Sequence, residues 1–276
     1  MAVQIPLSQE ARATEDKGDE HIRELTPDVA YRRLTMVNIV FVGLPGAKDW
    51  VLIDAGLHGS APSIIAAATA RFGADNPPAA ILMTHAHFDH VGALVDLLEH
   101  WNCPVYAHAL ETPYLTGQQA YPPPDAAADG GIIPKLSPLF PRDPIDVSRW
   151  LRQLPEDGSV PPLPGWQWVH TPGHTTGHIS LWRQQDRLLI AGDAVITTGQ
   201  ESAYEVVVQE PEMHGPPRYL TPDWVAAEQS VRLLASLEPD LLVTGHGRAM
   251  QGAEMTAALH QLADNFRQIA VPRSQH

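Results

Sequence analysis

Short apolar runs alternate along this chain with longer stretches in which apolar residues recur every three or four positions. The short runs, rich in Val, Ile and Leu, predict strands, and the longer spacing predicts amphipathic helices that bury one face. Strands are expected at residues 34–42, 50–53, 80–83, 104–107, 165–170, 179–183, 187–191 and 241–243. Helices are expected at residues 60–72, from about 90 to 101, at 221–237 and at about 252–269. Because the two kinds of element alternate, we expect a layered α/β protein.

The ends of this pattern and a proline-rich middle set the expected domain organisation. Residues 1–26 are mostly polar and charged and predict a flexible N-terminal arm. Residues 27–276 are expected to form a single domain. Between about 116 and 164, prolines interrupt the pattern so often that a long connection with little regular structure is expected. This connection also carries isoleucine, leucine and phenylalanine, so we interpret it as a lid over a pocket, with an insertion that only covers a core edge as the alternative.

Composition narrows the class of protein. The chain has 276 residues, 44% of them hydrophobic, and a formal net charge of −14, which disfavours a nucleic-acid partner because acidic surfaces repel phosphates. No apolar run approaches the length of a membrane span, and the polar N-terminus lacks the apolar core of a signal peptide. We therefore expect a cytoplasmic protein that acts on a small molecule without a membrane partner, and a homodimer remains open. Cys103 is the single cysteine, which excludes a disulfide within the chain and favours a small buried hydrophobe.

The densest chemistry lies between His85 and His90, where three histidines and an aspartate fall within six residues, in the order His85, His87, Asp89, His90. A predicted buried strand precedes them and a predicted helix follows, so they occupy the carboxyl end of a strand, where open α/β sheets place their sites. Uncompensated, this group would gather repelling donors and a desolvated carboxylate in one place. A divalent cation resolves that conflict, so the loop predicts metal binding. His85 and His87 point the same way on an extended backbone, and Asp89 and His90 can address a second ion.

Four further candidates stand singly at strand ends, beside or near glycine, which lets the backbone approach an ion closely. Asp54 ends the predicted strand at 50–53 and can orient a ligand histidine, although a simple turn-forming role is equally open. His174, Asp193 and His246 follow later strands and are candidate metal ligands only in combination with the loop at His85.

These motifs, taken in order, are Thr-His-x-His-x-Asp-His at 84–90, Pro-Gly-His-Thr at 172–175, Gly-Asp at 192–193 and Gly-His-Gly at 245–247. With Asp-Ala-Gly at 54–56, they make the chain closely resemble the metallo-β-lactamase superfamily from about residue 34 to the C-terminal helix. The resemblance implies an α/β fold, the αββα four-layer sandwich of the metallo-β-lactamase type, with a dinuclear site at one edge. It implies one metal held by His85, His87 and His174, a second held by Asp89, His90 and His246, and Asp193 as the bridge. The full set looks like the glyoxalase-II and lactonase branch. His170 and His178 match no ligand position and are interpreted as supporting or structural residues.

The function that follows is a dinuclear-metal-dependent hydrolase in which a metal-bridging hydroxide attacks an ester-like carbonyl of a small molecule: a thioester, lactone or ester. Asp89 is the candidate catalytic residue, which orients the water and passes a proton to the leaving group. A ligand set of nitrogen and oxygen suits two zinc ions first, and also iron or manganese.

Two departures from that branch leave the substrate open. Only 30 residues follow His246, fewer than the helical domain that glyoxalase-II enzymes use to bind glutathione, and Ile196 stands where some lactonases carry a tyrosine. A hydroxyl from Thr197, Thr198 or Tyr204 could replace that tyrosine. A role as ordinary loop residues is equally open for all three. Three other activities are weighed. β-Lactam hydrolysis is the first alternative, an iron-dependent persulfide dioxygenase is the second, and a nuclease is opposed by the acidic charge.

Overall fold

In a computed structural model of the chain, residues 4–14, 16–17, 22–126, 128, 133–200 and 210–275 are described. They form two compact units, each with its own hydrophobic core. We call residues 14–121 and 142–164 the N-terminal unit, and residues 1–13, 122–141 and 165–276 the C-terminal unit. Within the described ranges, no helix is long and apolar enough to cross a membrane.

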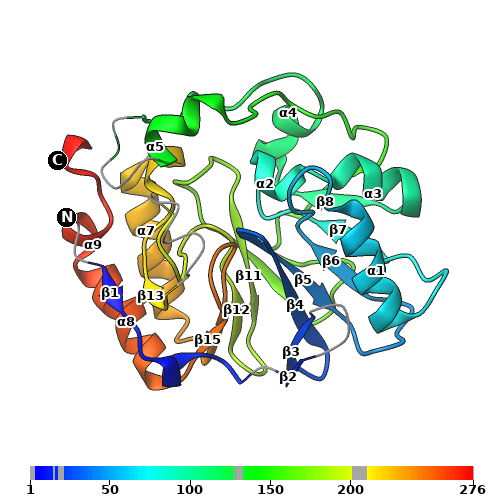
Figure 1. The fold of residues 1–276 in the computed structure, drawn as a ribbon, viewed down its shortest axis with the longest axis horizontal. Helices are drawn as coiled ribbons and strands as arrows, with labels where there is room; N and C mark the ends of the chain where they lie inside the picture. The colour runs from blue at the N-terminus through cyan, green and yellow to red at the C-terminus, as the bar shows by residue number, and fades with distance from the viewer. Residues whose placement is uncertain are drawn as a thin grey trace. The chain divides into compact units, whose positions relative to one another are not determined.

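The N-terminal unit is built on a single eight-stranded sheet in which the strands follow one another in chain order (Figure 1). Its strands are β2 (Asp16–Lys17), β3 (Arg23–Thr26), β4 (Val29–Leu34), β5 (Val37–Val42), β6 (Val51–Ile53), β7 (Ala80–Leu82), β8 (Val105–Ala107) and β9 (Leu151–Gln153). Strands β2 to β6 pair antiparallel, whereas β6 to β9 pair parallel. Because β6 and β7 are parallel neighbours, their carboxyl ends meet at the same edge of the sheet. That edge carries Asp54 and the loop at His85.

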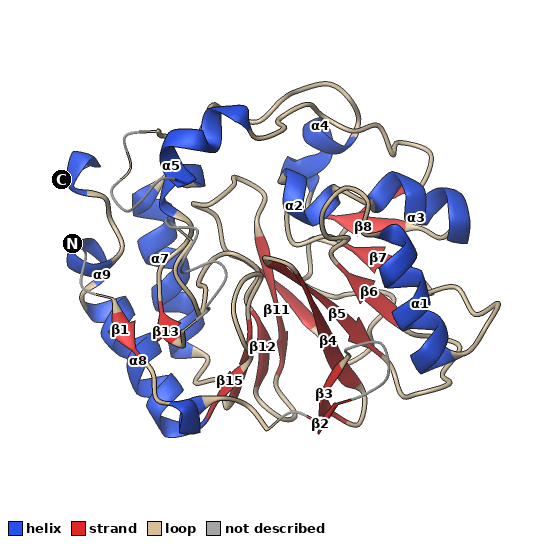
Figure 2. Cartoon of the chain, in the orientation of Figure 1, coloured by secondary structure: helices blue, strands red, loops and turns tan. Residues whose placement is uncertain are grey.

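Helices cover one face of this sheet and bury their apolar stripe against it (Figure 2). They are α1 (Ala61–Phe72), α2 (Phe88–Val91), α3 (Leu94–Trp101), α4 (Thr112–Leu115) and the 3₁₀ turn η3 (Ala109–Glu111). Trp50 anchors the core beneath them: its ring stacks on Phe72 at 4.3 Å between centroids and meets the edge of Trp101 at 5.6 Å. Its indole N–H also donates to the Asn76 carbonyl at 3.1 Å, so this fully buried side chain is satisfied. The core fixes the strands that end at the candidate ligands.

The C-terminal unit contains a five-stranded sheet in the order β10 (Gln167–His170), β11 (Ile179–Arg183), β12 (Leu188–Ile190), β14 (Leu241–Val243), β15 (Met250–Gln251). In this sheet β12 and β14 pair parallel and the other described neighbours pair antiparallel, and a separate two-stranded sheet joins β1 (Ile5–Pro6) to β13 (Glu212–Met213). The helical segments are α5 (Ile133–Leu136), α7 (Trp224–Ser236), α8 (Gly252–Asp264) and α9 (Phe266–Ile269), with 3₁₀ turns η1 (Gln9–Ala11), η4 (Ser137–Leu139), η5 (Arg218–Leu220) and η6 (Arg273–Gln275). Leu189, Leu242 and Met250 of the sheet share one core with residues of α7 and α8. The carboxyl ends of β10, β12 and β14 point the same way, which brings the loops after them to one edge.

Most predicted elements are present, with four differences. The strand expected at 34–42 is the second strand of a hairpin, because the chain turns at Thr35, which has a φ of 47°. The helices expected at about 90–101 and 252–269 are each divided into two. The proline-rich segment contributes β9, which pairs with β8.

The flexible arm expected at residues 1–26 is wrong for two stretches, since β1 and β3 pair with β13 and β4. Buried side chains explain this, because Ile5, Leu7 and Ile22 all lie in the cores. Residues 1–3, 15 and 18–21 lie outside the described part of the chain, as do 201–209, which include Tyr204.

Candidate metal centre

In the N-terminal unit, the loop after β7 and the short helix α2 gather four buried side chains: His85 and His87 from the loop, and Asp89 and His90 from α2. The ring centroids of His85 and His87 are 4.8 Å apart, and those of His85 and His90 are 4.1 Å apart. Asp89 sits in the first turn of α2, and its Oδ2 lies 4.0 Å from Nε2 of His90. These four candidate ligands therefore lie together, as the spacing predicts.

Asp54 fixes the orientation of two of these histidines. Its Oδ2 accepts from Nδ1 of His90 at 2.8 Å and from the Thr84 hydroxyl at 2.8 Å, while Oδ1 accepts from the Thr84 amide at 2.8 Å. Because the Thr84 proton is committed to Asp54, the contact of 3.1 Å between Thr84 Oγ1 and His85 Nδ1 is one in which the ring donates. Both imidazoles thus carry their proton on Nδ1 and present Nε2 as the unprotonated nitrogen, the arrangement that metal-binding histidines use. The structure thus places Asp54 in the contact with a candidate ligand histidine that its predicted orienting role requires.

We expect Asp54→Asn to weaken divalent-metal binding by about 10- to 100-fold, the usual range for residues that orient metal-binding histidines. Asn keeps the left-handed backbone, since Asp54 has a φ of 61° and Asn tolerates that region well. It replaces one carboxylate oxygen by an NH₂ group, which cannot accept from both Thr84 and His90. Metal affinity is measured by competition with a chromophoric chelator.

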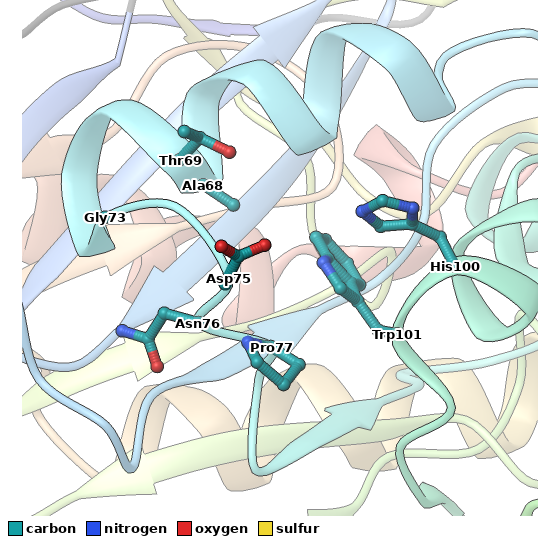
Figure 3. A pocket seen from close by; sticks show the side chains of 8 residues that line it. All are labelled: Ala68, Thr69, Gly73, Asp75, Asn76, Pro77, His100 and Trp101. Carbon is teal, nitrogen blue, oxygen red and sulfur yellow. The ribbon is translucent and has the colours of Figure 1, made fainter.

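The matched control is Asp75→Asn, since Asp75 also has a positive φ, 53°, in the same unit. It lines a pocket of ≈ 180 Å³ at the C-terminal ends of α1 and α3, and none of the candidate ligands contributes to that pocket (Figure 3). Equal metal affinities for the two variants would contradict the role assigned to Asp54.

In the C-terminal unit, His174 and His246 converge on the carboxylate of Asp193, and all three residues are buried. Nε2 of His246 lies 3.1 Å and Nε2 of His174 lies 3.5 Å from the same Oδ2 of Asp193. Two ligand atoms bound at about 2.1 Å to one tetrahedral ion would be separated by roughly 3.4 Å. The separations of 3.1 and 3.5 Å therefore allow this oxygen to bind the same ion as either imidazole nitrogen. Nδ1 of His174 contacts the Thr221 hydroxyl at 3.1 Å, and that hydroxyl donates to the Pro217 carbonyl, so this ring also presents Nε2.

The turn that carries Asp193 is held by a network in which each hydrogen bond has one direction. The Asp193 amide donates to Nε2 of His178 at 2.9 Å, which places the ring proton on Nδ1, beside the Thr171 hydroxyl at 2.9 Å. Thr171 then donates to the Ser180 hydroxyl, which donates to the Ala191 carbonyl two residues before Asp193. A further bond from the Gly245 amide to the Gly192 carbonyl, 2.8 Å long, joins the Asp193 turn to the turn before His246. His178 is thus a supporting residue, as predicted.

Gly173 lets the loop before His174 pass close to α7. A Cβ at this position would lie 2.4 Å from the Ala227 amide nitrogen, and the φ of Gly173 is 130°. We expect Gly173→Ala to destabilise the protein by about 1–3 kcal/mol more than Gly165→Ala, because a backbone atom of a helix cannot move aside cheaply. Gly165 is a matched control, since its φ is 86° but nothing lies within 4 Å of the added Cβ.

Thermal unfolding measures the difference, which corresponds to roughly 5 °C in Tm. Equal melting temperatures for Gly173→Ala and Gly165→Ala would show that the close approach to α7 is unimportant.

The sequence does not predict two residues that the structure adds to the candidate site, Glu111 in η3 and Tyr121. Both are buried, the Tyr121 hydroxyl bonds to the Glu111 carboxyl, and both contact the amide of Ala86 between His85 and His87. Burial, followed by the charge of Glu111 and the hydrogen bond to it, raises the pKa of Tyr121 well above its ordinary value, so the phenol stays protonated and donates. They lie 25 and 35 residues beyond Ala86 in the chain, and no motif spacing marks them.

Other candidate side chains have structural partners instead. Burial raises the pKa of the Cys103 thiol to about 11, so the thiol is protonated at neutral pH and the side chain acts as the small buried hydrophobe that was predicted. The Thr197 hydroxyl donates to the Arg248 carbonyl at 2.7 Å and is buried, which favours the plain loop role for this residue. His170, which is partly exposed, contacts the Thr176 carbonyl through Nε2 at 2.9 Å.

Comparison with known proteins identifies relatives over most of the chain. The family model described as the metallo-beta-lactamase superfamily matches residues 32–246. A protein of Bacillus subtilis (strain 168) named probable metallo-hydrolase YflN is 50% identical over 235 residues, which cover 85% of this chain and 89% of the relative. Hydroxyacylglutathione hydrolase GloC of Haemophilus influenzae is 28% identical over 121 residues, 43% of this chain and 50% of the relative. Among solved structures, TTHA1623 in a di-iron-bound form is 29% identical with a TM-score of 0.52, covering 84% of this chain and 95% of that one.

Proposed function

Since this chain belongs to the metallo-β-lactamase superfamily, we propose that it hydrolyses an ester-like bond of a small molecule at a centre of two divalent metal ions. The family resemblance and the α/β metallo-β-lactamase fold expected from the motifs are both confirmed, and the chain is a metallo-hydrolase of this superfamily. The substrate, the identity of the metals and the ligand assignment are the parts that we propose.

The ligand assignment carries over from the family pattern onto matching positions. His85, His87 and His174 would hold one ion, Asp89, His90 and His246 would hold the other, and Asp193 would be shared. Zinc suits this set of imidazoles and carboxylates, and iron or manganese is the alternative. A relative described as di-iron-bound supports testing iron alongside zinc.

The observation that supports the proposal best is the position of Oδ2 of Asp193, which two buried imidazole nitrogens approach at 3.1 and 3.5 Å. Three buried histidines, His85, His90 and His174, have Nδ1 held by a side chain, so Nε2 is the nitrogen left for a metal. A protein that used these three histidines only for packing would have no need to hold all three rings through Nδ1.

When bound, the two ions supply a water molecule of lowered pKa and a Lewis acid for the substrate carbonyl. The residues of the chain then supply position and proton transfer. Asp89, fixed on the first turn of α2, would accept a proton on its carboxylate as the water oxygen bonds to the carbonyl carbon. As the bond from carbon to the leaving oxygen or sulfur breaks, the same proton would pass to that atom. The products are a carboxylic acid and an alcohol or thiol, so the reaction balances without another reactant.

Two observations bear on the substrate class. The relative named hydroxyacylglutathione hydrolase acts, by its name, on an acyl-glutathione, which supports including thioesters among the substrates. The formal charge of −14 supports a small molecule in preference to nucleic acid.

A substrate panel tests the proposal. Metal-replete protein is assayed on thioesters, lactones, simple esters, phosphoesters and β-lactams, with metal content measured in parallel. We expect the fastest hydrolysis among the first three classes, and its loss in His87→Ala. Full activity of His87→Ala on the best substrate would reject the proposed centre, and fastest hydrolysis of a β-lactam would reject the substrate class. If the protein contains one iron per chain and consumes oxygen when given a persulfide, the proposed hydrolase activity would be replaced by a persulfide dioxygenase activity.

A further inference from the structure

The peptide bond between His85 and Ala86 is hydrogen-bonded to two buried side chains from a later part of the N-terminal unit. The amide of Ala86 donates both to Oε2 of Glu111 and to the hydroxyl of Tyr121, each at 3.0 Å. The Tyr121 hydroxyl in turn donates to the same Oε2 of Glu111. Glu111 has no exposed surface and Tyr121 is 8% exposed. One backbone N–H is thus bonded to a tyrosine and a carboxyl that are bonded to each other.

The ring of Tyr121 also contacts a candidate ligand directly. Its centroid lies 4.3 Å from that of His87, and the ring also stacks on Tyr114 at 3.9 Å with an interplanar angle of 11°. The backbone carbonyl of Tyr121 accepts from Arg142 at 3.1 Å. The ring is therefore held by two other rings and at its backbone, and the imidazole of His87 rests against a surface that cannot easily shift.

We propose that Tyr121 and Glu111 are positioning residues that hold the Ala86 peptide and the His87 ring so that His85 and His87 face one metal ion. This inference rests on the proposed function, because it assumes that these two histidines bind an ion. Neither Tyr121 nor Glu111 is assigned as a ligand.

The physical need for such a pair follows from the local backbone. His85 and His87 lie in a non-regular stretch between the end of β7 and the start of α2, where the Ala86 amide bonds to side chains, Glu111 and Tyr121. A peptide that can rotate would turn the two imidazoles apart. A buried amide without a partner is also costly, by about 1–3 kcal/mol, so the chain must supply acceptors for it. Tyr121 and Glu111 supply them and thereby select one orientation of the peptide.

Three variants separate the contributions of the pair. Tyr121→Phe removes the hydroxyl and keeps the ring on His87, Glu111→Ala removes the shared acceptor, and Glu111→Gln keeps a carbonyl oxygen that can accept from the Ala86 amide. We expect the zinc affinity of the weaker of the two metal sites to fall about 10-fold in Tyr121→Phe and up to about 100-fold in Glu111→Ala. In Glu111→Gln it should stay within about threefold of the wild type, because the acceptor remains.

The control is Trp150→Phe, which removes a hydrogen bond of 2.9 Å to Asn102 in the same unit. Zinc affinity is measured by chelator competition, ions per chain by elemental analysis, and ligand geometry by the visible spectrum of the cobalt-substituted protein. A purely structural role would lower the melting temperature of the metal-free protein and leave the cobalt spectrum unchanged. A positioning role alters the cobalt spectrum of Tyr121→Phe.

The outcomes separate this inference from the proposed function. Wild-type protein that binds no divalent ion overturns both. Wild-type protein that binds two ions, with Tyr121→Phe and Glu111→Ala matching its affinity and spectrum, overturns only the positioning role. If Glu111→Ala fails to fold, Tyr121→Phe decides alone, since a phenylalanine ring fills the same space. Reduced affinity and an altered spectrum in Tyr121→Phe, with Glu111→Gln close to the wild type, support the inference.

Discussion

Asp193→Ala should lose hydrolase activity by more than about 100-fold, beyond the range seen when only an orienting residue is removed. The reason is geometric, because one oxygen of Asp193 faces both His174 and His246. On the proposed assignment, its removal would delete a ligand for both ions at once and leave the two buried imidazoles without the carboxylate between them. Metal content should fall below two ions per chain in the same preparation, which elemental analysis measures alongside the rate.

The control for Asp193→Ala is Asp240→Ala in the same unit. Asp240 is an exposed aspartate that pairs with Arg187 at 3.1 Å, and an exposed pair of this kind contributes little to stability. We expect Asp240→Ala to retain the wild-type rate and metal content. An Asp193→Ala protein that keeps two ions and more than a tenth of the activity would exclude Asp193 as the shared ligand.

Removing the metals should be the second large effect, and it should change stability as well as activity. A ligand present at about 1,000 times its Kd stabilises the folded protein by about 4.1 kcal/mol, so chelation should lower Tm by roughly 10 °C. The loss should be larger than for a surface ion, because the candidate ligands are buried histidines and carboxylates whose mutual arrangement an ion would compensate. Activity should vanish with the ions and return when they are restored.

Thermal unfolding with and without a chelator, followed by adding back zinc, iron or manganese singly, measures both effects and ranks the metals. The control is Asp193→Ala, whose melting temperature should respond much less to the chelator. An unchanged Tm and unchanged activity after complete removal of metal would refute a metal-dependent reaction.

The candidate ligands that lie closest in sequence are the ones whose proximity in the fold is easiest to predict. His85, His87, Asp89 and His90 fall in six residues after a buried strand, and a loop of that length cannot separate them far. Asp54 was also within reach, since a carboxylate after a strand that precedes a glycine is placed at the same sheet edge as the loop after β7. The role of Thr84 could not be predicted from the motif. It depends on the Thr84 hydroxyl donating to Asp54 and accepting from His85, which only the structure reveals.

Residues that act from a distance could not be found in the sequence. Glu111 and Tyr121 reach Ala86 through folding of the segment after β8, and nothing in their spacing indicates that they meet. Thr221 reaches His174 from the turn before α7, 47 residues later. Such contacts are fixed by tertiary packing, which local periodicity does not encode.

The fold shows the same division. Apolar runs at β6, β7, β12 and β14 predicted strands correctly, because buried parallel strands are apolar along their whole length. The short pairings β1 with β13 and β8 with β9 were missed. Two or three paired residues give no periodic signal, and the partners of these pairs lie far apart in sequence.

The one-way network around His178 limits which amino acids can occupy that position. The side chain there must accept a proton at one end, from the Asp193 amide, and donate one at the other, toward Thr171. Among polar side chains, the amides of asparagine and glutamine share this two-ended character with neutral histidine, whereas lysine and arginine only donate. Very few amino acids could therefore replace His178, although this residue is not among the candidate metal ligands.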